Sequence, residues 1–418
     1  MIRILITIAI VAVFRILSFI PIPLFDTEWL KATDAFGSGF LGILNSYSGQ
    51  ALSRFSILAL GISPFITASI AVQLMQTVIP AMKEWQEQGE EGRHKSARLT
   101  RYIALVMAFA QGLLLVIGAG TKGSQLQLGV DNNFFTYVYM ALVITAGSAV
   151  TIWMADFITA KGIGNGTSIM IAVGIMTSIP IMIATLNTKY LVTRTAGNIS
   201  LYVTILVLYI LMLLAVVYMQ IATRKIPTQY ANRQGKSDSH IPIKLNSSGV
   251  LPVIFASTIL SIPLTIAGFT GQQTTGGLAN AADWIDMIFN YQKPIGFIIY
   301  VILIVVFSFF YTFMTINPHK MAENLQQSQA FIPGIRPGED TKNFIARLVF
   351  KITVIGTLYL VVVAIMPILI SWAFGFSAAE ASAITVGGTG LLIIVGVAVE
   401  TTSQLENQAN QDEYSGLF

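Results

Sequence analysis

Long apolar runs separated by polar loops extend along almost the whole chain. A run of about 20 uncharged residues is long enough to cross the hydrocarbon core of a bilayer as a helix. The pattern predicts ten transmembrane spans, at residues 2–25, 57–79, 102–121, 134–154, 164–186, 201–221, 249–268, 295–316, 348–370 and 382–399. The tail, 401–418, is polar, and we expect no packed structure there.

The second predicted span is unusual for a membrane helix. At 1.5 Å per residue, 57–79 would extend roughly 35 Å, enough to cross a bilayer. Gly61 and Pro64 weaken its start, and polar residues interrupt its aliphatic surface, namely Ser63, Thr67, Ser69, Gln73 and Gln76. Ile62 and Ile66 are four residues apart, which places them on one face of a helix.

The segment before this span, 40–52 (FLGILNSYSGQAL), is apolar but too short to cross a membrane. Glycines and serines interrupt it. It fits a half-inserted piece beside a water-lined path, and it fits equally well an external loop that leads into a proline-kinked helix. The stretch alone favours neither interpretation.

Composition places the chain among multi-span membrane proteins. Hydrophobic residues make up 54% of it, charged residues make up 11%, and the mean hydropathy is +0.72. There is no cysteine, which excludes disulfides and thiolate metal sites, and the three histidines lie in separate polar loops, so we expect no metal and no cofactor. The start, Met1-Ile2-Arg3 followed by a long apolar run, fits a first span better than a signal peptide.

The loops alternate in charge, and this alternation predicts an orientation. Most lysines and arginines lie in the loops near residues 83–101, 222–247 and 317–347. By the positive-inside rule these loops are cytoplasmic, and so are both termini. Ten spans divide into two halves of five with opposite orientation, which predicts a substrate path between the halves. We therefore expect an N-terminal half at 1–186, an external hinge at 187–200 and a C-terminal half at 201–400.

The predicted spans contain almost no ionisable residue, which argues against an ion-coupled carrier. Arg15 and Lys351 are the main exceptions, with Asp156 and Glu400 at span ends, and we interpret Arg15 as a polar contact between helices or a residue that reaches the interface. The run 162–168 (GIGNGTS) lacks the lysine of a phosphate-binding loop, so its small residues indicate close helix packing. Thr167 and Ile171 repeat the four-residue spacing of Ile62 and Ile66.

Hydroxyl residues in the seventh span share one side of a helix: Ser257, Thr258, Ser261 and Thr265. They can bond their own helix backbone, which is common in membranes, or form a polar seam that faces the second span. The basic loops carry another distinctive motif. In 331–338 (FIPGIRPG), two Pro-Gly pairs favour turns that hold Arg336 at a tip, which indicates docking of a cytoplasmic partner.

At these residues the chain resembles the SecY family of protein-conducting channels. The similarity extends over essentially the whole chain, at 19–23, 49–54 (GQALSR), 59–69, 92–102, 162–168, 241–257 (IPIKLNSSGVLPVIFAS), 331–338 and 387–393. The resemblance implies two five-helix halves, a narrow pore ring, a plug and a lateral gate between helices 2 and 7. The physics agrees, because a channel for arbitrary polypeptides gains from an aliphatic constriction that gates by dewetting.

Carried over by position, the resemblance assigns roles to individual residues. The pore ring would be Ile62, Ile66, Thr167, Ile171, Ile254 and Ile393. The plug, at about 40–52, would include Phe40, Leu41, Ile43, Leu44 and Tyr47. The gate would involve Gln73, Ser257 and Thr258, and the sites for a motor or ribosome would be Arg224, Lys225, Arg233 and Arg336.

The resemblance also implies partners and a location. These are the small subunits SecE and SecG, the motor ATPase SecA, the ribosome, signal peptides and nascent chains, and membrane lipids, in the cell membrane of a bacterium. It implies no catalysis by this chain. Two features depart from the family pattern: Thr167 replaces the usual aliphatic residue, which would make the seal slightly more polar, and the chain begins at the first span without a preceding basic amphipathic helix. An accessory member of the family with few substrates and an inverted-repeat carrier for a small solute stay open as alternatives.

Overall fold

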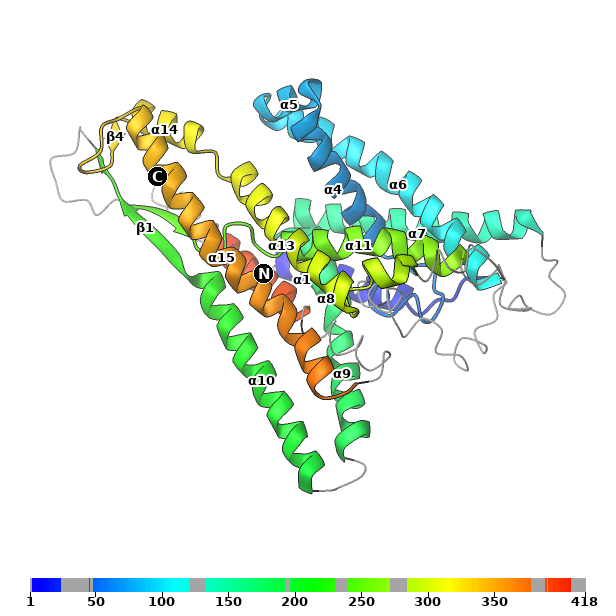
Figure 1. Ribbon diagram of the computed structural model, residues 1–418. Helices are drawn as coiled ribbons and strands as arrows, with labels where there is room; N and C mark the ends of the chain where they lie inside the picture. Colours follow the sequence, from blue (N-terminus) through cyan, green and yellow to red (C-terminus); the bar gives the residue numbers. More distant parts are fainter. Residues whose placement is uncertain are drawn as a thin grey trace.

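The computed structural model describes residues 2–23, 45, 48–120, 133–191, 196–230, 240–270, 284–376, 388 and 390–406, and these are mostly helical (Figure 1). The first group of helices comprises α1 (Ile2–Leu17), α4 (Ser63–Val78), α5 (Pro80–Glu87), α6 (Glu90–Gly120), α7 (Phe134–Lys161), α8 (Gly166–Met176), α9 (Ser178–Leu186) and the π-helical turn η1 (Asn187–Leu191). Helix α6 packs between α4 and α7, and α7 also contacts α1 and α8.

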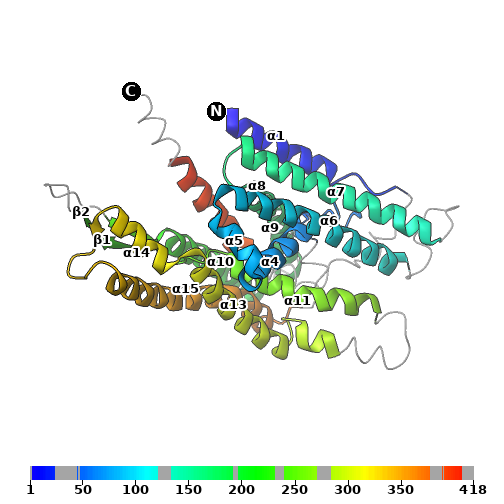
Figure 2. The same ribbon diagram turned by 90° about the horizontal axis from the view of Figure 1, so that it is seen from above.

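The second group comprises α10 (Ala196–Ile221), α11 (Leu251–Thr270), α13 (Pro294–Thr315) and α15 (Glu339–Ala373), and residues 390–406 are also helical. Helix α13 contacts both α11 and α15, and α10 contacts α15. Figure 2 shows α1, α6 and α7 along one side of the molecule and α13 and α15 along the other. The two groups meet where α11 contacts α4 and α6 and where α10 contacts η1.

Six helical stretches of the described residues are long and apolar enough to cross a membrane: Glu90–Ile117, Phe134–Lys161, Gly166–Leu191, Ile199–Ile221, Pro294–Gln327 and Glu339–Ala373. The other four predicted spans overlap α1, α4, α11 and the helix at 390–406. Over the described residues, each of these helices is shorter than the six stretches above. Helices α1 and α4 have 16 residues each, or roughly 24 Å, which is less than the hydrocarbon core of a typical bilayer.

Local sequence explains why these two helices are shorter than their predicted spans. The first span was predicted to reach residue 25, but α1 ends at Leu17 and turns follow, before Pro21 and Pro23, which lack the N–H that a helix needs. Helix α4 begins at Ser63, two residues after Gly61 with φ +52°, and Pro64 lies in its first turn. The prediction that Gly61 and Pro64 weaken the start of the second span is therefore confirmed.

The two basic loops form one folded unit at one end of the molecule (Figure 1). Strand β1 (Thr223–Pro227) pairs antiparallel with β3 (His240–Lys244), and β2 (Gln229–Tyr230) pairs with β4 (Ala330–Phe331) of the other loop. Helix α14 (Pro318–Gln327) completes the unit. Its core contains Ile226 and Ile243 from the first loop, Ile332 from the second, and Ile345 and Val349 from the start of α15.

The tail differs in part from the prediction. The helix that begins at residue 390 continues through Glu406, so its last six residues, 401–406, belong to the polar segment for which no packed structure was expected. Thr401 donates its hydroxyl to the carbonyl of Val397, 2.7 Å away. The helix therefore extends past its apolar part, where backbone bonds and not burial maintain it.

Candidate functional site

Five isoleucines from four segments of the chain converge on one buried cluster. They are Ile62 and Ile66 at the start of α4, Ile171 on α8, Ile254 on α11 and Ile393 on the helix 390–406. Their exposed fractions are 2%, 8%, 7%, 3% and 2%. Segments as far apart as α4 and the last helix thus contribute aliphatic side chains to one hydrophobic cluster, which also contains Ile70, Ile158 and Ile175.

Backbone spacing allows this convergence. A methyl group at Gly390 would lie 2.2 Å from Cγ2 of Ile175, so only glycine permits the last helix to approach α8 this closely. On the other side of α8, a methyl group at Gly166 would lie 1.9 Å from the carbonyl oxygen of Ala155 on α7. The interpretation of the 162–168 run as a close-packing segment is therefore confirmed.

A cavity of about 430 Å³ lies against the isoleucine cluster. Four of the five isoleucines line it, namely Ile66, Ile171, Ile254 and Ile393, and Thr167 also lines it. The remaining lining is mixed: its polar residues include Ser69, Gln73, Asn165, Gln220, Lys244, Asn246, Ser248 and Glu400, and its apolar residues include Phe65, Val250, Leu251, Phe255, Val397 and Val399. We call this cavity the vestibule.

Thr167 is half-buried, and its hydroxyl has a local partner. Its Oγ1 donates to Oδ1 of Asn165 at 2.6 Å, and its backbone N–H donates to the same oxygen at 3.1 Å. Asn165 is the N-cap of α8, so this bond stabilises the start of the helix. The hydroxyl of Thr167 therefore already has a hydrogen-bond partner, so it makes the seal less polar than the sequence predicted.

The predicted plug residues Phe40, Leu41, Ile43, Leu44 and Tyr47 lie outside the described residues. The end of the predicted plug segment is described, and it is part of the core: Ser48, Ala51 and Leu52 are fully buried. Asn45 organises this turn, since its Oδ1 accepts from the N–H of Ser53 at 2.8 Å and its carbonyl accepts from the N–H of Gln50 at 2.7 Å.

Arg15 reaches this same turn from α1. Its Nη1 donates to the carbonyl of Gly49 at 2.8 Å. Gly49 has φ +66°, and a methyl group on it would lie 3.0 Å from Arg15 Nη1 and 3.5 Å from the backbone of Gly174. The interpretation of Arg15 as a polar contact between segments is therefore confirmed.

The predicted gate residues divide into two kinds. Ser257 and Thr258 both donate to the carbonyl of Ile254, at 2.9 and 2.7 Å, and Ser261 donates to the carbonyl of Thr258. These hydroxyls bond their own helix, which is the ordinary membrane pattern. Gln73, in contrast, lines the cavity and donates from Nε2 to Ser69 Oγ at 3.1 Å.

The predicted docking residues lie on the surface of the loop unit. Arg224 and Lys225 are exposed on β1, and Arg336 is exposed in the turn before α15, while Arg233 lies outside the described residues. Ile332 and Ile335 anchor that turn in the core of the unit. Gly334 and Gly338 adopt φ +82° and +99°, as the two predicted turns require, and Thr341 donates to the carbonyl of Arg336 at 2.8 Å.

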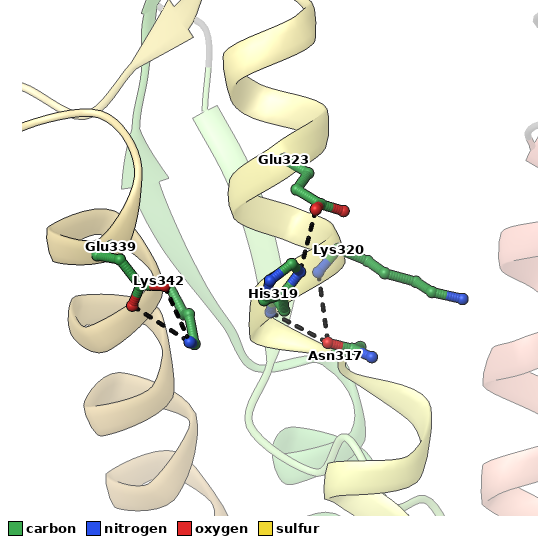
Figure 3. Close-up of polar contacts among 6 residues, drawn as sticks. All are labelled: Asn317, His319, Lys320, Glu323, Glu339 and Lys342. Carbon is green, nitrogen blue, oxygen red and sulfur yellow. Dashed lines mark hydrogen bonds and ion pairs between the residues drawn. The ribbon is translucent and has the colours of Figure 1, made fainter.

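Helix α14 beside this turn is fixed by its own polar contacts (Figure 3). Asn317 caps it by accepting from the N–H groups of His319 and Lys320, at 3.0 and 3.3 Å. His319 Nδ1 lies 3.3 Å from Glu323 Oε1, whereas the Lys320 side chain extends away from these contacts. The unit therefore presents basic side chains on a rigid support.

Sequence reasoning missed the two buried amides of the vestibule, Gln220 and Asn246. Their exposed fractions are 9% and 4%. The signal was present, since Gln220 is the polar residue that ends an apolar run and Asn246 lies in a motif already singled out (IPIKLNSSGVLPVIFAS). The sequence does not show that the last helix is a neighbour of Gln220. In the structure, a methyl group at Gly396 would lie 3.7 Å from Gln220 Nε2.

Comparisons with known proteins agree with this geometry. The SecY family model matches residues 56–402. The protein translocase subunit SecY of Bacillus licheniformis is 40% identical over 429 residues, which cover 100% of this chain and 96% of that protein.

Two solved structures share the fold. One is a SecY structure described by its plug domain, which stabilises the closed state of that translocation channel and maintains a membrane seal; it has a TM-score of 0.65 and 19% identity over 97% of this chain and 92% of that one. The other is Sec61 in a canine ribosome–channel complex, with a TM-score of 0.65 and 18% identity over the same shares. By its family model and its full-length relative, this chain belongs to the SecY family.

Proposed function

We propose that this chain is the central pore-forming subunit of a Sec translocon, which conducts unfolded secretory proteins across the membrane and releases membrane proteins laterally into the bilayer. The observation that carries the proposal is the cluster of five isoleucines beside the vestibule, built by both groups of helices. Family membership supports the same function.

The constriction suits a polypeptide better than a small solute. Five of the six ring side chains are aliphatic, and the one hydroxyl, on Thr167, already donates to Asn165, so the ring presents no charge that would select one ligand. A narrow apolar constriction excludes water and ions by dewetting. Dispersion contacts between isoleucines are individually weak, so the ring can part and close around different side chains. In this account Ile62, Ile66, Thr167, Ile171, Ile254 and Ile393 form the ring.

We propose ten membrane crossings in two inverted halves, 1–186 and 201–400, joined by an external hinge at 187–200. The helix that overlaps each predicted span supports this count. The concentration of lysine and arginine in the loops 222–247 and 317–347 supports a cytoplasmic location for these loops and for both termini, including the tail 401–418. The chain is thus a multi-pass protein, and the cell membrane of a bacterium is its proposed location.

We propose that α4 and α11 form the lateral gate and that the segment at about 40–52 forms the plug. The contact between α4 and α11 supports the gate, since these helices belong to different groups. Because the gate hydroxyls Ser257 and Thr258 bond their own helix, the seam is closed mainly by apolar packing around Ile254 and Phe255, which are both buried. An apolar segment of a translocating chain can replace the apolar contacts between α4 and α11 with little loss of free energy.

The basic loop unit is the proposed docking surface for a cytoplasmic motor of the SecA type and for the ribosome, through Arg224, Lys225, Arg233 and Arg336. SecE and SecG are the proposed small subunits, and signal peptides, nascent chains and membrane lipids are the proposed ligands of the gate. The exposed basic side chains on a rigid support favour this assignment. An external source of energy is required, because a channel of this kind supplies none itself.

Reconstitution tests the function directly. The purified chain, assembled with its small subunits in proteoliposomes, should protect a secretory precursor from added protease when the motor and ATP are present. Without ATP, protection should be absent. Saturable uptake of a small solute with no protection of the precursor would contradict the proposal and indicate a carrier.

A further inference from the structure

The fifth span, which α8, α9 and η1 make up, is divided between two buried clusters. The buried apolar side chains of α8 belong to the isoleucine cluster, together with residues of α1, α4 and α7. Those of α9, Met182 and Leu186, belong instead to the cluster that contains residues of α10, α13 and α15, and so does Tyr190 of η1. Figure 1 shows α9 leading away from α7 toward the ends of α10 and α15. The change of neighbours occurs between α8 and α9.

The helix is interrupted at the same point. Thr177 separates α8, which ends at Met176, from α9, which begins at Ser178. The N–H of Thr177 donates to the carbonyl of Gly174 at 3.3 Å, three residues back and not four as in an α-helix. Pro180 has no N–H, so it cannot donate to the carbonyl of Met176, four residues earlier. A proline and a break in the hydrogen-bond ladder are the usual causes of a helix kink, so the span can bend here.

The far end of the span is anchored to the second group of helices. Lys189 Nζ donates to the carbonyl of Gly375 at 3.2 Å and lies 4.1 Å from the centre of the Phe376 ring. The ring of Tyr190 meets the Phe376 ring edge-on, with centroids 5.9 Å apart. Gly375 and Phe376 directly follow α15 and its C-cap, Phe374. The first part of the connection 187–200 is therefore attached to the end of α15.

We propose that the two groups of helices move relative to each other about the break at Thr177–Pro180, and that α9 and η1 move as part of the second group. The inference rests on the proposed function, in which α4 and α11 separate when the gate opens. It refines the hinge proposed above, because it places the pivot inside the fifth span, before the connection 187–200. Hinges of this kind are formed by a few residues at the ends of rigid elements.

The packing beside the break fits a pivot. A methyl group at Gly390 would lie 2.2 Å from Cγ2 of Ile175, so the last helix and the end of α8 are in close contact two residues before Thr177. Atoms next to a pivot are displaced least. This tight contact between the two groups can therefore persist while α4 and α11 move apart.

Distances between spin labels test the pivot. The chain has no cysteine, so two introduced cysteines can be labelled selectively in the complex assembled with cysteine-free small subunits. Ile183 on α9, Tyr139 on α7 and Leu369 on α15 are exposed positions for the labels. Pulsed electron–electron double resonance compares the empty channel with one that holds a precursor stalled by a folded domain. The 183–139 distance should change by more than about 2 Å, and the 183–369 distance should stay the same.

A third pair, Met75 on α4 and Ile262 on α11, reports the gate itself. Any change in the 183–369 distance would overturn the inference, since α9 would then move relative to α15. A constant 183–139 distance in a channel whose 75–262 distance changes would also overturn it, because the pivot would lie elsewhere. A constant 75–262 distance would instead contradict the proposed gate.

Pro180→Ala tests whether the break serves opening. Alanine supplies an N–H that can bond the carbonyl of Met176 and join α8 to α9, so opening must break one additional hydrogen bond. ATP-dependent precursor protection should become about two- to tenfold slower, with an unfolding temperature at or above that of the parent. Pro294→Ala is the matched control, since Pro294 is exposed at the first position of α13, where a helix needs no N–H. A parental rate in Pro180→Ala would overturn the inference.

Discussion

At the scale of single residues, the seal depends on side chains that have no polar atoms. Ile62, Ile254 and Ile393 are each at most 3% exposed, so water contacts very little of their surface. A single polar atom at such a position has no partner in the cluster, and its hydration becomes the driving force for water to enter.

We predict that Ile393→Asn wets the constriction. A buried amide without partners costs about 1–3 kcal/mol, and water in the ring relieves this cost. The resting ion conductance of the reconstituted channel should rise several-fold, and precursors with defective signal sequences should be exported. Ile393→Leu, which conserves volume, should preserve the seal. Parental conductance in Ile393→Asn would show that position 393 lies outside the ring.

We predict that Thr167→Val hardly changes the seal. The hydroxyl of Thr167 already donates to Asn165 Oδ1, so its removal costs one side-chain hydrogen bond, about 0.5–1.5 kcal/mol of unfolding free energy. The N–H of residue 167 still donates to Asn165, so the cap of α8 is kept. Conductance should stay at the parental level while the unfolding temperature falls slightly. A marked drop in resting leak would mean that the hydroxyl does hydrate the ring.

Some of these residues could be predicted from spacing alone and others could not. Ile62 with Ile66, and Thr167 with Ile171, are pairs four residues apart at the starts of two interrupted spans, so each pair shares a face. Ile254 and Ile393 have no such signal, because their partners lie on other segments, and only resemblance to the family indicated them. Gln220 and Asn246 were missed for the same reason.

At the scale of elements, the basic loop unit shows how two distant loops become one surface. The β2–β4 pair and the shared isoleucine core join the loop after α10 to the loop before α15. Periodicity could not predict this unit, because the paired strands have two residues each and the pairing crosses a long stretch of chain. The Pro-Gly turns, in contrast, were predictable, since Gly334 and Gly338 require positive φ.

We predict that Arg336→Glu slows motor-driven translocation at least several-fold and leaves folding intact. Arg336 is exposed, and the anchors Ile332 and Ile335 are unaffected by the change. ATP-dependent precursor protection in proteoliposomes measures the rate. Arg93→Glu, the same charge reversal at an exposed position of α6, is the control. Equal rates in Arg336→Glu and the parent would show that this arginine plays no part in docking.

The seventh span illustrates a choice that the sequence left open. The spacing of Ser257, Thr258 and Ser261 allowed either a polar seam or bonds within the helix, and the three donate to carbonyls three or four residues earlier. A pattern of positions shows which residues share a face, but it does not show whether a neighbouring backbone satisfies them.

At the scale of the whole molecule, two groups of helices share buried apolar clusters. One cluster joins α10, α11, α13 and α15 to α9 and η1, and the isoleucine cluster joins α11 and α13 to α1, α4, α7 and α8. The six described helices that are long and apolar enough to cross a membrane could be predicted from hydropathy, but the convergence of distant segments could not, because no residue-level repeat relates the halves.

We predict that deletion of residues 40–44 raises the resting ion conductance. The deletion stops before Asn45, because Asn45 and residues 48–52 form a buried, hydrogen-bonded turn whose loss would damage the fold. Planar-bilayer recordings provide the measurement, and an equal-length deletion in the polar tail, 412–416, is the control. Equal conductance with and without residues 40–44 would show that these residues do not act as a plug.

The central claim is that a polypeptide passes between the isoleucines where the two groups of helices meet. Photocrosslinking from single positions to a precursor stalled in the channel tests it most directly. The account predicts strong crosslinks from Ile66, Ile171 and Ile393 and none from Ile210, which is 60% exposed on α10. Crosslinks from position 210 that equal those from the isoleucine cluster, or their absence from all three cluster positions, would contradict it.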